Sequence, residues 1–128
     1  MNRKIWSEVQ NYENICICVK LAILRGIESM FPGIYGFLKF KSLATYGLSP
    51  DELSLNDFAA FARLLNELFN DRETLESAIR HIISGLTEKS REVTKAVLSG
   101  DERELYTTLS NLRDPALQRN CRKLLKWE

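Results

Sequence analysis

Residues 14–27, NICICVKLAILRGI, decide the fold. Their apolar side chains recur at steps of three and four residues, which is the spacing of one face of an α-helix. The residues on this face are Ile15, Cys18, Val19, Ala22, Ile23 and Ile27. Other apolar residues widen the face, so we predict a central helix. Phe31, Pro32 and Gly33 should end it, because the residue before a proline leaves the helical region and glycine accepts a left-handed turn.

The same spacing continues outward along the chain. It runs through residues 34–46, 58–69 and 71–83 and, more weakly, through residues 87–125, which Gly100 and Pro115 interrupt. A short helical turn is expected at residues 50–53. Residues that cap helix N-termini precede these segments. They are Ser49, Asn56, Asn70 or Asp71, Asp101 and Asp114.

These patterns predict an all-α fold. We expect a compact bundle of about six helices with a short extra helical turn, because no segment alternates apolar and polar residues as a strand does. Hydrophobic residues make up 45% of the 128 residues and charged residues 27%, which is typical of a globular chain. We expect residues 1–128 to form a single domain, in which residues 14–86 make a central bundle and residues 87–128 form C-terminal helices packed on it.

The cysteines and the apolar stretches indicate the cellular compartment in which the protein is expected. The three cysteines, Cys16, Cys18 and Cys121, show no disulfide-framework spacing, so we expect free buried thiols and no oxidising compartment. The longest apolar stretch, residues 15–24, is broken by Lys20 and is too short to span a bilayer. It also lacks a signal-peptide cleavage site. The expectation is a cytoplasmic protein without a membrane partner.

No residue pattern indicates catalysis or a cofactor. His81 is the only histidine and lies among isoleucines, which favours a structural or surface role. Cys16 and Cys18 are about 200° apart around a helix and point away from each other, which disfavours a shared metal ion. We therefore expect no catalytic residues, no cofactor-binding residues and no metal ligands.

Positive charge gathers at the C-terminus, where residues 113–128 hold five Lys/Arg against two Asp/Glu. These five cations, the candidate contacts to phosphates or to an acidic partner, are Arg113, Arg119, Arg122, Lys123 and Lys126. The alternative is a solvated face whose cations stabilise the C-terminal end of a helix.

Aromatic residues crowd one short region. They are Phe31, Tyr35, Phe37, Phe40 and Tyr46, interleaved with Lys39 and Lys41. Aromatic and basic residues in alternation can stack nucleic-acid bases. The helical spacing of Phe37 and Phe40 instead favours a place in the core or in a packing surface. If some of them were exposed, they would form a patch suited to self-association or to docking a partner.

Residues 22–86 resemble the small helical archaeal domains named after Nitrosopumilus output domains. The similarity lies in LAILRGIES at residues 21–29, LATYGLSPDEL at residues 43–53 and LLNELFNDRETLESAIRHIISGL at residues 64–86. Asn70 stands where that family is expected to have glycine, and the basic C-terminal helices are a further departure. The resemblance implies a helical output or partner-binding module in signalling, with no catalytic residue to carry over.

Two functions follow as hypotheses. The first is a non-enzymatic regulatory or protein-interaction domain, which presents an apolar helix face to a protein partner or to another copy of itself. The second is a nucleic-acid-binding regulator that uses the basic C-terminal helix, with residues 50–69 as an element similar to a helix-turn-helix.

Overall fold

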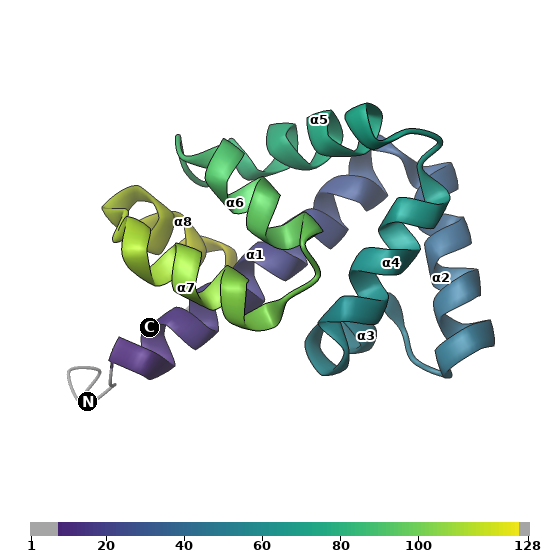
Figure 1. The fold of residues 1–128 in the computed structure, drawn as a ribbon, viewed down its shortest axis with the longest axis horizontal. Coiled ribbons are helices and arrows are strands. Elements are labelled where there is room, and N and C mark those ends of the chain that lie inside the picture. Colours follow the sequence, from purple (N-terminus) through teal and green to yellow (C-terminus); the bar gives the residue numbers. More distant parts are fainter. Residues whose placement is uncertain (1–7, 126–128) are drawn as a thin grey trace.

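The computed structural model describes residues 8–125, which form eight α-helices and contain no strand (Figure 1). The expected all-α class is confirmed. In chain order the helices are α1 (Glu8–Met30), α2 (Pro32–Tyr46), α3 (Pro50–Asn56), α4 (Phe58–Leu68), α5 (Arg72–Ile83), α6 (Ser90–Leu98), α7 (Glu102–Leu112) and α8 (Pro115–Leu125).

The expected count of about six helices with a short extra turn is wrong. The expected turn at residues 50–53 is a seven-residue helix, α3, whose N-cap Ser49 and Glu52 form a complete capping box. Residues 90–125 form three helices because Gly100 ends the first of them and Arg113 ends the second. Both residues have positive φ angles, 71° for Gly100 and 47° for Arg113, which no α-helix can continue.

The first helix is the centre of the molecule, as its sequence predicts. It contacts α2, α3, α5, α7 and α8. Ile15, Val19, Ile23 and Ile27 are all at most 1% exposed. In Figure 1, α2, α3 and α4 gather at the right of the view, α7 and α8 at the left, and α5 lies along the top. Every other part of the fold is therefore positioned against α1 or against a helix that contacts it.

The junction between α1 and α2 differs from the expectation. Gly33 lies inside α2 and is not a left-handed turn, because Pro32 already occupies the first helical position. Phe31 alone breaks the helix, with φ −135° and ψ 65°. Since a single residue joins the two helices, α2 folds back against α1.

One expected N-cap is displaced by one residue, and a second lies at one of two expected neighbours. Asp57, and not Asn56, accepts the N-terminal N–H of α4, because Asn56 is still the last residue of α3. For α5 the sequence allows Asn70 or Asp71, and Asp71 is the cap. In both cases a carboxylate stands next to an amide, and the carboxylate makes the charge-assisted bond to the helix N-terminus.

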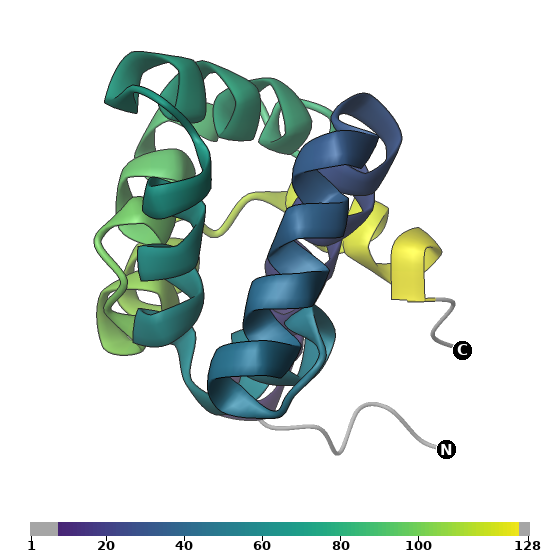
Figure 2. The same cartoon turned by 90° about the vertical axis from the view of Figure 1, so that its right-hand side faces the viewer.

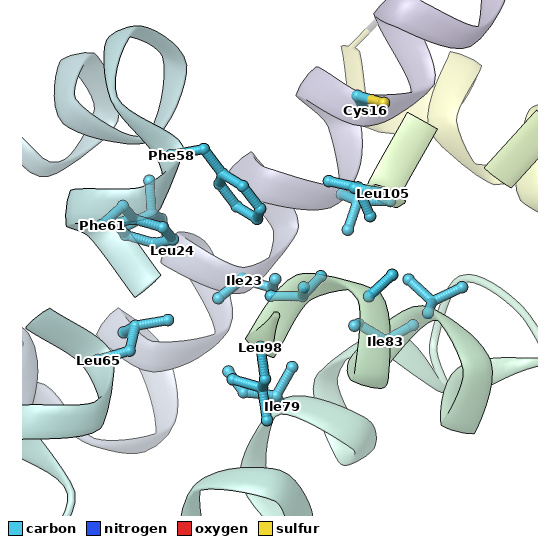
Figure 3. Packing of buried hydrophobic residues seen from close by; sticks show 14 of the residues in the cluster. Cys16, Ile23, Leu24, Phe58, Phe61, Leu65, Ile79, Ile83, Leu98 and Leu105 are labelled. Carbon is cyan, nitrogen blue, oxygen red and sulfur yellow. The ribbon is translucent and has the colours of Figure 1, made fainter. Parts of the chain in front are cut away.

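The core lies between α1, α4, α5, α6 and α7 (Figure 3). Phe58, Phe61 and Leu65 of α4 gather around Ile23 and Leu24 of α1. Four further buried residues are labelled there: Ile79, Ile83, Leu98 and Leu105.

A disulfide joins the first and the last helix of the described chain. Cys18 of α1 and Cys121 of α8 are bonded, with their Cα atoms 5.7 Å apart. The expectation of free thiols is therefore wrong for these two residues and holds for Cys16, which is free and buried. Sequence spacing could not show the pair, because 103 residues separate its members and only the packing of α8 on α1 brings them together.

Candidate interaction surface

The outward side of α2 carries large apolar residues in contact with solvent. Phe37 is 65% exposed, Phe40 is 66% exposed and Leu43 is 49% exposed. Figure 2 shows α2 at the front of the molecule with no other helix over it. We call this surface the α2 outer face and define it by six residues: Gly33, Gly36, Phe37, Phe40, Leu43 and Ala44.

This helix is apolar on both sides. Leu38 and Ser42 are fully buried, and at 100° per residue they lie on the side opposite Phe37 and Phe40. The inner side contacts α1, α3 and α4. Of the two expected places for Phe37 and Phe40, the core or a packing surface, the structure excludes the core. A surface helix normally has a polar outer face, so an apolar outer face makes this surface the candidate site.

Small residues adjoin the two phenylalanines. A Cβ atom added at Gly33 or at Gly36 would meet nothing within 4 Å. Ala44 is also exposed, one turn after Phe40. The α2 outer face thus has two protruding rings in its middle and shallow stretches on either side.

Charged residues border the α2 outer face. Lys41 forms an ion pair with Glu67 of α4, with Nζ and Oε1 3.6 Å apart, and both side chains are about half exposed. Lys39 is exposed on the opposite border. A polar border around an apolar centre is the usual anatomy of a protein interface.

The basic residues expected to contact phosphates lie on the surface at the other end of the molecule. Arg119, Arg122 and Lys123 share one exposed side of α8, and Arg113 is exposed in the left-handed turn before it. No ion pair joins these four to any described residue. Lys126 lies outside the described residues.

A buried lysine is the chief polar feature that the sequence did not reveal. Lys20 is 1% exposed, and its ammonium bonds Glu102 of α7 and lies 4.8 Å from the centre of the Phe58 ring. The sequence pattern shows Lys20 only as an interruption of an apolar stretch. Lys20 and Glu102 border a cleft of about 860 Å³ between α1, α3 and α7.

The remaining reactive side chains are separated from one another. Burial raises the pKa of the Cys16 thiol to about 12, so this thiol is neutral at physiological pH. His81 is exposed on α5. Among residues 8–125, no three His, Cys, Asp or Glu side chains come together as metal ligands would. None of the helices in that range has the length and apolar character required to cross a membrane.

The chain matches no protein-family model, no curated protein and no solved structure. The resemblance to the Nitrosopumilus output domains therefore stays a prediction.

Proposed function

We propose that this protein is a non-enzymatic regulatory domain that associates with a second copy of itself through the α2 outer face. The observation that carries the proposal is the pair of neighbouring phenylalanines, each about two-thirds exposed at the centre of an apolar surface. Exposing them costs free energy in a monomer, which a covering partner recovers.

The shape of the α2 outer face favours a second copy as the partner. A two-fold axis makes the same surface meet itself. In an antiparallel pair whose axis passes at the level of residue 38, Phe40 of each copy lies over the partner's Gly36. Each ring then fills the shallow stretch that the other copy provides, so protruding and shallow parts match.

The charges on the Lys41 border fit the same arrangement. In an antiparallel pair of helices, each border meets the same border of the other copy. The border with Lys41 also carries Glu67. It therefore presents both signs, and two such borders can exchange ion pairs without net repulsion.

The available area sets the strength of the association. A phenylalanine offers about 200 Å² when fully buried, so Phe37 and Phe40 together offer about 260 Å² per copy. With Leu43 and the small residues, a pair would bury about 800 Å² in total, which is below the standard size of a specific interface. We expect a reversible dimer with a Kd on the order of 10–100 μM.

Sedimentation velocity over protein concentrations from about 1 μM to about 500 μM tests the proposal. The wild type should shift from monomer to dimer, and the double variant F37S/F40S should stay monomeric with an unchanged melting temperature. L124S is the matched control, because Leu124 is an exposed leucine, 41% accessible, on α8. A monomeric wild type, or equal loss of the dimer in L124S, would contradict the proposal.

The basic side of α8 supports a second candidate function, binding of nucleic acid. Its three exposed cations form no ion pair with a described residue and are suited to phosphate contacts. A salt-dependent mobility shift of labelled RNA or DNA that is lost in R119Q/R122Q would favour it. No shift at about 50 mM salt would exclude it, because low salt strengthens such contacts.

The cytoplasmic location expected from the sequence stays a prediction. The Cys18–Cys121 disulfide counts against it, because disulfides persist mainly in oxidising compartments.

A further inference from the structure

A polar cleft of about 480 Å³ lies between α5 and α6, away from the α2 outer face and from α8. A short connection joins these two helices, and α6 turns back below α5 in Figure 1. The cleft is lined by side chains from both helices, most of them cationic or hydroxyl-bearing. They include Arg72, Ser77 and Arg80 from α5, and Arg91, Thr94 and Lys95 from α6.

The cations of this cleft are incompletely neutralised. Arg72 bonds Glu76, with Nε and Oε2 3.4 Å apart, and also the side-chain oxygen of Asn66. Arg80, Arg91 and Lys95 form no ion pair with any residue in the described range. Like charges from two packed helices thus face the same space, which destabilises the fold unless an anion lies between them.

Two carboxylates also line the cleft. Glu76 is occupied by Arg72, so its charge is largely compensated. Glu73 is near the N-terminus of α5, where it interacts favourably with the helix dipole. Four cations against two carboxylates leave the lining with an excess of two positive charges.

Thr94 is an independent indication of a ligand. It lines the cleft and is only 4% exposed. Its Oγ1 atom is buried without a hydrogen-bond partner, the only such side-chain atom in the described part of the chain. A buried hydroxyl normally has a partner, because an unmet hydrogen bond costs free energy. Because Thr94 lines the cleft, a ligand bound there is the candidate partner for its hydroxyl.

We propose that the α5–α6 cleft binds a phosphate monoester carried by a small molecule. Guanidinium groups bind phosphate oxygens through two parallel N–H donors, which Arg80 and Arg91 can supply. Lys95 adds a compact positive charge, and the Thr94 hydroxyl adds a neutral donor. The cleft volume is within the range of small-molecule sites, so it holds a phosphate with part of the group that carries it.

This site does not depend on the dimer proposed above. Its residues lie on α5 and α6, whereas the α2 outer face lies on a helix that contacts α1, α3 and α4. Ligand binding should therefore survive in F37S/F40S. A failure of one proposal leaves the other standing.

Amide NMR shifts of the intact protein, titrated with inorganic phosphate and with phenyl phosphate, test the site. We expect shifts at α5 and α6 with a Kd on the order of 1 mM or tighter, and tighter binding of the ester. Sodium chloride at the same ionic strength should produce no such shifts. Saturation by phosphate alone, with no gain from the ester, would limit the site to the free anion and overturn the ester assignment.

Three variants locate the binding. R91Q/K95Q should weaken phosphate binding by about tenfold or more, and R119Q/R122Q, the matched pair on α8, should leave it unchanged. T94V should weaken binding by about threefold to tenfold without lowering the melting temperature. If R91Q/K95Q and R119Q/R122Q weakened phosphate binding equally, or if T94V kept full affinity, the site would be overturned.

Discussion

Gly26 of α1 lies beneath Ile82 of α5 so closely that a Cβ atom on Gly26 would stand 2.6 Å from the Ile82 Cδ1 atom. The Cγ1 and Cγ2 atoms of Ile82 would be within 2.8 Å of it as well. A glycine inside a helix costs about 1 kcal/mol relative to alanine. Here it allows α5 to approach the central helix.

The variant G26A should therefore be less stable than the wild type by about 1–2 kcal/mol, because overpacking outweighs the gain in helix propensity. G36A is the matched control. A Cβ at Gly36 meets no atom within 4 Å, so this variant should be more stable by up to about 1 kcal/mol. Urea denaturation at low protein concentration measures both. Equal effects of the two substitutions would show that Ile82 does not press on Gly26.

The Cys18–Cys121 disulfide should contribute strongly to stability, because it joins residues 103 positions apart and restricts the unfolded chain. The double variant C18A/C121A should lose about 2–4 kcal/mol of unfolding free energy. C16A removes a similar buried sulfur and leaves the disulfide intact, so it should lose clearly less. Denaturant unfolding with equal losses in the two variants would mean that the crosslink itself stabilises nothing.

The ion pair between the buried Lys20 and the half-exposed Glu102 should respond unequally to its two substitutions. E102Q leaves a lysine ammonium with 2% side-chain exposure and no counter-charge. Since Glu102 is half exposed and water can partly replace it, the expected cost is about 1–3 kcal/mol. K20M removes the buried charge and should cost less than E102Q, and the double variant should resemble K20M. Thermal unfolding checks this order, and the reverse order would contradict it.

The free thiol of Cys16 should be almost unreactive in the folded protein. Burial raises its pKa from 9.0 to about 12, so its thiolate fraction at pH 8 falls by about 1,000-fold. Alkylation by iodoacetamide should therefore be slow until the chain unfolds. A rate at pH 8 like that of a free cysteine would contradict the burial.

The same pKa predicts a pH dependence of stability. The folded thiol holds its proton more tightly than the unfolded thiol does. Its contribution to the unfolding free energy is therefore complete below the pKa of the unfolded thiol. It is lost as the pH rises from about 9 toward 12. The unfolding free energy of C16A should decline less than that of the wild type across this interval.

The sequence predicted the central helix and the helix class well, since both depend on local spacing. Ile15, Val19, Ile23 and Ile27 are all buried as their periodicity indicates. The cap at Ser49 also formed as expected, because a capping box is contained in four residues. Asn56 was displaced as a cap because Asp57, one residue later, competes for the same helix N-terminus, and of the two expected caps of α5 the carboxylate, Asp71, is the one that forms.

The features that the sequence missed depend on contacts between distant residues. The disulfide and the bond between Lys20 and Glu102 join positions 103 and 82 residues apart. The exposure of Phe37 and Phe40 had a local signal, since α2 is apolar on both sides. Spacing alone, however, does not show which side of such a helix packs inward. The cations of the α5–α6 cleft are spread over two helices and become neighbours only when these pack.

The most direct test of the central claim, that the α2 outer face is covered by another copy, is a dilution series followed residue by residue. Amide hydrogen exchange should show protection at residues 33–44 that grows with protein concentration, while α5 and α8 stay unchanged. Protection that is independent of concentration, or that appears on other helices instead, would contradict the claim.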